Sequence, residues 1–173
     1  MELKEAIRKR QSIRDFSDTT IPPLVIDEIL DYANQAPSAG NLQARDFIIV
    51  DDEFQKEQLS IAANHQTFIA EAPVIIIVCA NLKRISSYGK RGRELYCIQD
   101  ASAAVEHILL MAVDYGLDTC WVGAFDEQAV STLLELPSSI RPVALIPLGC
   151  TKKTTAPRTK RMETKLLTHH NRW

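Results

Sequence analysis

A short segment near the start of the chain combines two arginines and a serine within five residues. Arg10, Ser12 and Arg14 form the motif R-x-S-x-R, with Gln11 after the first arginine. Guanidinium groups and a hydroxyl hold a phosphate well, because they donate charge-assisted hydrogen bonds. The alternative is the basic end of an exposed helix, and the segment taken alone favours that interpretation.

A second candidate segment, A-P-S-A-G-N-L-Q at residues 36–43, is rich in small residues. Small side chains at Pro37 and Ala39 let a ligand approach the backbone. Ser38 and Asn41 add hydrogen-bond donors and acceptors. The alternative is an ordinary connection between a helix and a strand, which the segment favours when it is considered in isolation.

Two further segments could contact a ligand. In T-C-W-V-G-A-F at residues 119–125, Gly123 follows a strand and could present a bare backbone N–H to a flat ring. The alternative is a strand end with a packed tryptophan. The C-terminal tail contains Arg158, Lys160 and Arg161. It is either a second anion clamp or a solvated run of charge.

Alternating helical and strand patterns must position these segments. Helices are expected to stop near Arg10, to begin at Pro22 and Pro23, and to span residues 54–63, 94–115 and 127–134. Strands are expected at residues 46–50, 74–79, 119–123 and 143–149, and residues 86–93 are expected to form a mobile polar loop. These patterns alone indicate an α/β architecture, a central sheet flanked by helices.

Two of these elements are unusually apolar. Residues 74–79 are apolar at every position, as in a strand that is covered on both faces. The long helix at residues 94–115 is apolar nearly all round, so we expect it to lie in a core or between subunits. Gly116 is expected to cap its C-terminal end.

Length and composition limit the classes of function. A chain of 173 residues with 46% hydrophobic and 24% charged residues predicts one folded domain, residues 1–173. A net charge of −2 gives no reason to expect binding to nucleic acid or an anionic membrane. There is neither a signal peptide pattern nor an apolar run that could span a bilayer, so a cytoplasmic protein is expected.

The cysteine and histidine patterns indicate neither a metal site nor an acid–base catalyst. The four cysteines form no C-x-x-C pair, and no histidine lies at a metal-ligand spacing from them. We therefore expect buried free thiols in a reducing compartment. The four histidines lack a partner pattern, and His107 on the long helix is expected to be exposed or at an interface.

Taken together, in this order and spacing, the separated segments resemble the nitroreductase family of FMN-dependent oxidoreductases. The matching motifs are R-x-S-x-R, A-P-S-A-G-N-L-Q, A-P-V-I-I-I-V, Q-D-A-S-A-A, G-L-D-T-C-W-V-G-A-F and R-P-V-A-L-I-P-L-G, followed by a basic tail that ends in tryptophan. The resemblance extends over essentially the whole chain.

The resemblance implies an α+β fold with a central mixed or antiparallel sheet flanked by helices. It also implies an intertwined homodimer, in which the C-terminal tail of one subunit extends over the other and FMN lies at the interface. The resemblance implies that Arg10, Ser12 and Arg14 bind the FMN phosphate and the pyrimidine edge of the flavin, and that Gln11 also contacts the cofactor. Pro37, Ser38, Ala39 and Asn41 of the other subunit would line the flavin and the ribityl chain. Val122 and Gly123 would lie against the ring, and Arg161, with Arg158 or Lys160, would complete the phosphate site.

The implied reaction is a ping-pong transfer of hydride. NADH or NADPH reduces the flavin and leaves, and a small-molecule acceptor such as a nitroaromatic, a quinone or a flavin enters the same slot. Because the flavin carries the chemistry, no catalytic side chain is assigned. The basic segment from Lys83 to Arg93 is brief compared with the lid of longer family members, which predicts an open pocket.

Two alternatives remain open from the sequence. One is a specialised flavin enzyme of the same fold, such as a dehalogenase or a flavin-fragmenting synthase. The other is a flavin-binding protein with little turnover. The yellow colour of the purified protein shows whether it binds a flavin. Reduction of the bound flavin by NADH or NADPH then shows whether the protein uses a nicotinamide donor.

Overall fold

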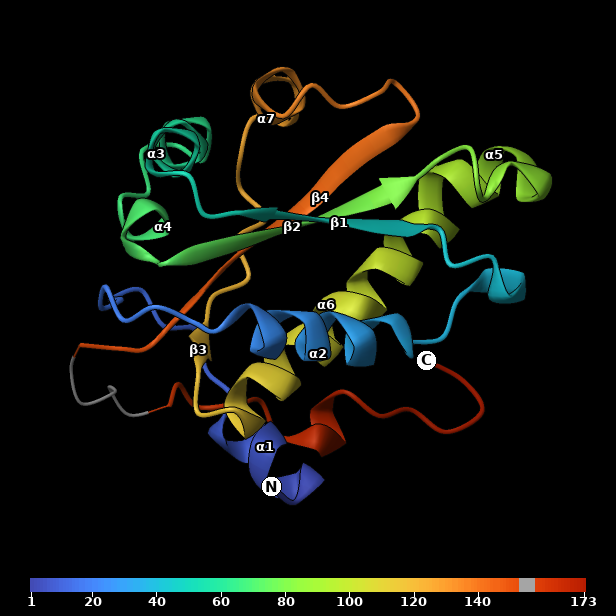
Figure 1. The fold of residues 1–173 in the computed structure, drawn as a ribbon. Helices are drawn as coiled ribbons and strands as arrows, with labels where there is room; N and C mark the ends of the chain where they lie inside the picture. Colours follow the sequence, from blue (N-terminus) through green and yellow to red (C-terminus); the bar gives the residue numbers. More distant parts are fainter. Residues whose placement is uncertain (153–157) are drawn as a thin grey trace.

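The computed structural model describes residues 1–152 and 158–173, and its centre is a sheet with helices on both faces (Figure 1). The strands pair in the order β1-β2-β4-β3, and every neighbouring pair is antiparallel. Their bounds are Arg45–Val50 for β1, Val74–Asn81 for β2, Asp118–Thr119 for β3 and Ile140–Gly149 for β4.

This sheet confirms the α+β fold with a central antiparallel sheet, and the α/β interpretation of the patterns was wrong. β2 is indeed buried along nearly its whole length. An apolar run indicates that both faces of a strand are buried, but it does not indicate the direction of the neighbouring strands. It therefore did not distinguish a buried antiparallel strand from a parallel one.

Alternate side chains of β2 enter two separate cores. Ile76 packs on one side with α2 (Pro23–Asn34) and α6 (Cys97–Asp114). Ile75 and Ile77 pack on the other side, where Figure 1 shows the remaining core helices. These helices are α3 (Glu53–Ala62), α4 (Phe68–Glu71) and α7 (Glu127–Leu133). The sheet is therefore the middle of three layers.

The long helix α6 is followed by the glycine that was expected to cap it. Gly116 has a φ of +73°, a conformation that suits glycine, and its N–H donates to the carbonyl of Val113. The helix is buried along one side, where Ala104 and Ile108 are fully covered, and Glu106 is exposed on another. The buried side of α6 thus belongs to the core of this chain.

The mobile loop expected at residues 86–93 is helical instead. Three short turns, η2 (Ser86–Tyr88), α5 (Gly89–Arg91) and the π-type turn η3 (Gly92–Tyr96), lead directly into α6. A Cβ on Gly92 would lie 2.9 Å from the backbone carbonyl oxygen of Ile85, and Ile85 itself is fully buried. The glycine therefore permits close helical packing here and does not mark a loop.

The strand expected at residues 119–123 is shorter than predicted. β3 ends at Thr119, and Val122 forms only an isolated bridge to Leu145. Between these points Cys120 faces Pro147, and its N–H reaches the proline carbonyl at 3.4 Å. Proline has no N–H to return a bond, so the ladder is interrupted there.

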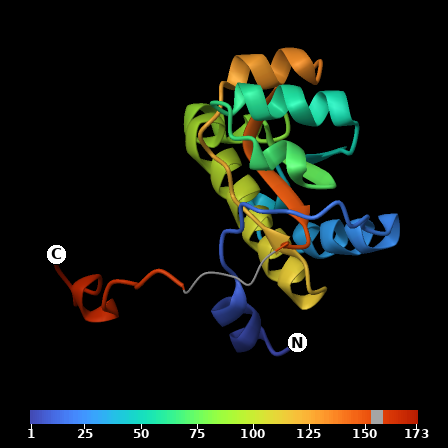
Figure 2. The same ribbon diagram turned by 90° about the vertical axis from the view of Figure 1, so that its left-hand side faces the viewer.

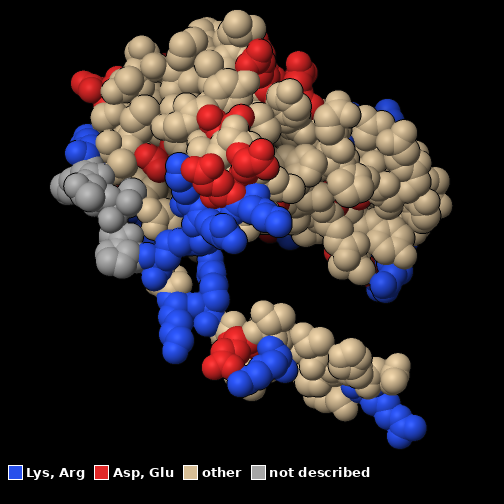
Figure 3. All heavy atoms as spheres, turned by 90° about the horizontal axis from the view of Figure 1, so that it is seen from below, with Lys and Arg blue, Asp and Glu red and all other residues tan. Residues whose placement is uncertain are grey.

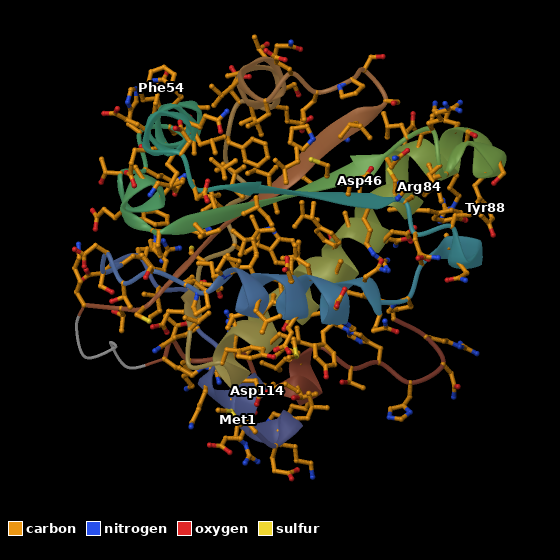
Figure 4. All side chains as sticks on the ribbon, viewed as in Figure 1. Met1, Asp46, Phe54, Arg84, Tyr88 and Asp114 are labelled. Atoms are coloured by element: carbon orange, nitrogen blue, oxygen red, sulfur yellow. The ribbon has the colours of Figure 1, made fainter. Side chains whose placement is uncertain are left out.

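The two ends of the chain expose apolar side chains. α1 (Leu3–Lys9) leaves Leu3 and Ile7 exposed, and the N-terminal ammonium group of Met1 pairs with Asp114 on α6 (Figure 4). The tail from residue 158 is exposed throughout and projects away from the body (Figure 2). Its exposed apolar residues are Met162, Leu166, Leu167 and Trp173.

Three of the four cysteines are buried, and all four are free thiols, as expected. Burial raises the pKa of the Cys79 thiol to about 12, so this group stays protonated and unreactive in the folded protein. His107 is half-buried, and its Nδ1 lies 3.0 Å from the carbonyl oxygen of Tyr32. None of the helices in the described part of the chain is both long enough and apolar enough to cross a membrane.

Candidate cofactor site

The R-x-S-x-R segment runs in extended form beside β3 and does not continue helix α1. The N–H of Ile13 donates to the carbonyl of Thr119 at 2.9 Å, and Ser12 and Thr119 form a parallel bridge. Ile13 is buried in the core. Because side chains alternate along extended backbone, burial of Ile13 leaves Ser12 and Arg14 exposed on the opposite side.

This segment lines a cavity of about 370 Å³, called here the arginine pocket. Its walls are Arg10, Gln11, Ser12, Ile13, Arg14, Arg158, Thr159 and Arg161. The fold thus brings together two of the candidate segments from opposite ends of the chain. Arg158 also donates to the carbonyl of Arg8 in the last turn of α1, which ties the tail to this helix. Lys160 is exposed and does not line the pocket.

The arginine pocket concentrates positive charge. Within residues 1–152 and 158–173, none of its four arginines forms an ion pair with a carboxylate. Figure 3 shows lysine and arginine side chains gathered on the underside of the molecule, near α1 and the tail. Guanidinium groups held close together without counter-charges favour an anion between them, and a phosphate dianion meets this requirement.

Cys120 is buried next to the arginine pocket, and the charge of the pocket affects the pKa of its thiol. Burial raises the pKa of the Cys120 thiol. The positive charge of Arg14 lowers this pKa, as do a hydrogen bond with Ser12 and the positive charge of Arg10. All three pocket residues of the motif therefore lie near one buried sulfur atom. The guanidinium of Arg14 also lies 5.8 Å from the centre of the Phe68 ring, a cation–π contact. Arg14 is thus held against the core.

The small-residue segment lines a different cavity, of about 530 Å³, called here the tyrosine pocket. Its walls are Pro37, Ser38, Ala39, Tyr88, Tyr96, Gln99, Asp100 and Ala103. The rings of Tyr88 and Tyr96 meet edge to face with their centres 5.5 Å apart. Asn41 is exposed and does not line this pocket. An aromatic wall beside a bare backbone suits a flat ligand.

Much of the basic segment between Lys83 and Arg93 serves the structure. Arg84 pairs with Asp46 at 2.9 Å, and Figure 4 shows both at the end of the sheet near Tyr88. Arg91 lies over the ring of Tyr96 and donates to its hydroxyl at 3.0 Å. The segment therefore holds one wall of the tyrosine pocket in place, a role that its sequence did not indicate.

Val122 and Gly123 lie outside both cavities. The backbone of Val122 exchanges two hydrogen bonds of 3.0 Å with Leu145, and its side chain is buried. Gly123 is exposed, and a Cβ added to it would meet nothing within 4 Å. Of these two residues, only the backbone of Gly123 is therefore open to a ligand.

Two amide side chains that the sequence did not single out fix the chain after Gly123. The carbonyl of Ala124 accepts hydrogen bonds from Asn64 at 3.2 Å and from Gln66 at 3.3 Å. Asn64 has a φ of +59°, which asparagine tolerates better than most residues. The sequence N-H-Q between a helix and a buried segment was the available signal for a structured turn.

The two cavities share no residue. In Figure 1 the turn at residues 39–41 lies beyond the C-terminal end of α2, whereas α1 lies at the bottom of the molecule. Within one chain the Arg10 segment and the Pro37 segment therefore line separate cavities.

Known proteins resemble this chain over most of its length. The model of the nitroreductase family matches residues 7–67 and 53–150. A relative from Archaeoglobus fulgidus, provisionally named NADH dehydrogenase/NAD(P)H nitroreductase, is 36% identical, and the match covers 87% of this chain and 86% of the relative.

Solved structures resemble it in the same way. A nitroreductase family protein from Clostridium novyi NT is 36% identical with a TM-score of 0.80, and the match covers 88% of this chain and 86% of that protein. An FMN-dependent nitroreductase from Clostridium difficile R20291 is 25% identical with a TM-score of 0.83, covering 97% and 98%. Since the motifs, the fold and these matches agree, the chain belongs to the nitroreductase family.

Proposed function

We propose that this protein is an FMN-dependent oxidoreductase that takes electrons from NAD(P)H. The observation that carries the proposal is the arginine pocket, where four arginines without carboxylate partners in the described residues surround Ser12. The FMN phosphate is the anion that this pocket would hold. Support comes from the Clostridium difficile protein, which is named FMN-dependent, and from the Archaeoglobus relative, which is named for NAD(P)H.

The proposed site needs a second copy of the chain. The phosphate would lie in the arginine pocket of one subunit, and the partner subunit would contribute Pro37, Ser38, Ala39 and Asn41. The tail supports this arrangement, because its apolar side chains are exposed and its first residues reach the arginine pocket. Such surfaces are stable in water when another chain covers them. Tail exchange between two copies would bury them.

When bound, FMN would supply the redox chemistry, accepting a hydride from the nicotinamide and passing electrons to an acceptor. The protein would bind and orient the reactants. Arg10, Ser12 and Arg14 would hold the phosphate, and the bare backbone at Gly123 would face the ring. Donor and acceptor would occupy one slot in turn, which is the basis of a ping-pong mechanism. Nitroaromatics, quinones and flavins are the proposed acceptors.

The hydride donor is tested by anaerobic mixing. Protein loaded with FMN is expected to lose its yellow colour when NADH or NADPH is added, because the donor reduces the bound flavin. Absorbance of the flavin is followed over time, and free FMN with the same donor is the control. Protein that binds no FMN would contradict the proposal at its centre. Bound FMN that neither donor bleaches would favour a binding protein with little turnover.

The shared site is tested by dilution. Because each cofactor would contact both chains, FMN is expected to dissociate as the protein is diluted to the monomer. Free FMN is detected by its fluorescence, and the oligomeric state is followed in parallel by analytical ultracentrifugation. A monomer that keeps its FMN would refute the proposal that the loop containing Pro37 comes from the partner subunit.

A further inference from the structure

Two charged side chains are buried beside the loop at residues 36–44. Asp100 on α6 is 4% exposed, and Arg45 at the start of β1 is 3% exposed. Neither belongs to the arginine pocket. A charge is costly to bury unless hydrogen bonds compensate it, so the partners of these two side chains indicate their purpose.

Asp100 binds the loop through its backbone amides. One carboxylate oxygen accepts from the N–H of Ala39 at 2.9 Å, and the other lies 3.3 Å from the nitrogen of Ala44. The first of these amides belongs to the residue that begins the turn at residues 39–41, and the second follows the turn, so a single carboxylate spans it. Asp100 also lines the tyrosine pocket together with Pro37 and Ser38.

The guanidinium of Arg45 binds backbone carbonyls at the end of α2 and at the start of the same loop. Its Nη2 donates to the carbonyls of Asn34 at 2.7 Å and Ala36 at 2.9 Å, and its Nη1 lies 3.5 Å from the carbonyl of Pro37. Burial lowers the pKa of the guanidinium, and the negative charge of Asp100 opposes this effect. The two side chains carry opposite charges and hold opposite kinds of backbone group.

The loop needs such support because its backbone is strained. Gly40 has a φ of +57°, which glycine adopts freely, but Asn41 and Gln43 follow with φ values of +56° and +51°. Asparagine tolerates this conformation better than most residues, whereas glutamine adopts it at a cost that the surroundings must offset. Hydrogen bonds within the loop add to the support, since the hydroxyl of Ser38 accepts from the N–H of Gln43 at 3.0 Å.

We infer that Asp100 and Arg45 are positioning residues for the cofactor, because they fix the shape of the loop that carries Pro37, Ser38 and Ala39. The inference rests on the proposed function, in which this loop lines the flavin. Arg45 does not line the tyrosine pocket, and the carboxylate of Asp100 is engaged by the amides of Ala39 and Ala44. They act through the backbone, so their replacement should weaken cofactor binding even where the protein remains folded.

The test is Asp100→Asn in the full-length protein. The asparagine has nearly the same volume, but its amide nitrogen must face one of the two loop N–H groups and cannot accept from it. FMN is titrated into apo-protein, and the loss of free FMN fluorescence gives the dissociation constant. We expect Asp100→Asn to raise this constant roughly tenfold and to alter the absorbance spectrum of the bound flavin.

Lys56→Met is the matched control. Lys56 is also 3% exposed, and its ammonium group donates to the carbonyl of Ala72 at 2.9 Å, remote from the loop. This variant is expected to change the melting temperature while the FMN affinity and the flavin spectrum stay as in the wild type. If Asp100→Asn does not fold, Arg45→Lys provides the same comparison, because the single compact ammonium group of lysine lacks the two-nitrogen fork with which Arg45 reaches the three carbonyls.

Two results would overturn the inference. One is wild-type FMN affinity and spectrum in the folded Asp100→Asn or Arg45→Lys protein. The other is an equal loss of FMN affinity in Lys56→Met, which would show that any buried charge has this effect. A wild-type protein that binds no FMN would instead overturn the proposed function, and the inference with it. The wild-type titration therefore separates the two failures.

Discussion

Replacement of Arg10 with alanine is expected to weaken FMN binding by about 1.5–3 kcal/mol, the usual scale for a hydrogen bond to a charged group. This loss corresponds to a rise in the dissociation constant of roughly ten- to a hundredfold. Arg10 lines the arginine pocket and has no carboxylate partner among the described residues. In the proposed site its charge is therefore available to the phosphate alone.

The measurement is a titration of apo-protein with FMN at fixed ionic strength, because salt screens the interaction. Lys4→Ala is the matched control. Lys4 lies on α1, carries the same charge as Arg10 and is exposed. Its loss changes the net charge equally and should leave FMN affinity within about twofold, since exposed charges at a distance are largely screened. Equal losses in both variants would mean that net charge and not the pocket decides affinity.

The fold was predictable from the sequence where hydrophobic patterns and prolines gave the same answer. Pro23 is the first residue of α2, as expected, and the apolar run at residues 74–79 lies within the buried strand β2. Predictions failed where one residue type has two uses. Gly92 suggested a loop but permits close packing of a helical turn. Pro147 lies within a strand and shortens the pairing of its neighbour, which no local pattern reveals.

The residues of the arginine pocket could be predicted from the sequence, but the way in which the fold brings them together could not. The R-x-S-x-R motif and the tail were both candidates for binding a phosphate, and the fold brings them together. Their arrangement depends on the hydrogen bond between Ile13 and Thr119, which joins residues more than a hundred positions apart. Long-range pairing of this kind leaves no local signal, so the segment was assigned to a helix end.

The support of the second loop was not predictable at all. Asp100 stands in the motif Q-D-A-S-A-A, and Arg45 follows A-P-S-A-G-N-L-Q-A. A charged residue in a sequence is first assigned to the surface, because charges are seldom buried. The available signal was the position of Asp100 next to the apolar stretch of the long helix. Only the tertiary contacts show that its carboxylate faces the loop.

The largest change in stability is expected from Ile76→Ala in the centre of β2. Ile76 is fully buried and packs in the core formed with α2 and α6. Removal of three carbon atoms from such a site leaves a cavity that the two helices and the neighbouring strands cannot fill without moving. The free energy of unfolding is expected to fall by about 2–5 kcal/mol. Urea denaturation of the apo-protein at one fixed concentration measures this change without the contribution of bound cofactor.

Ile49→Ala separates burial from the intrinsic preference of isoleucine for strands. Ile49 lies directly across from Ile76 in the β1–β2 register, but its side chain is 42% exposed. Both substitutions remove the same atoms from paired positions of one sheet. Loss of strand preference alone would cost about 1 kcal/mol or less at either site. A loss at Ile49 as large as that at Ile76 would show that the exposed face of β1 is covered in solution, as contact with a second chain would require.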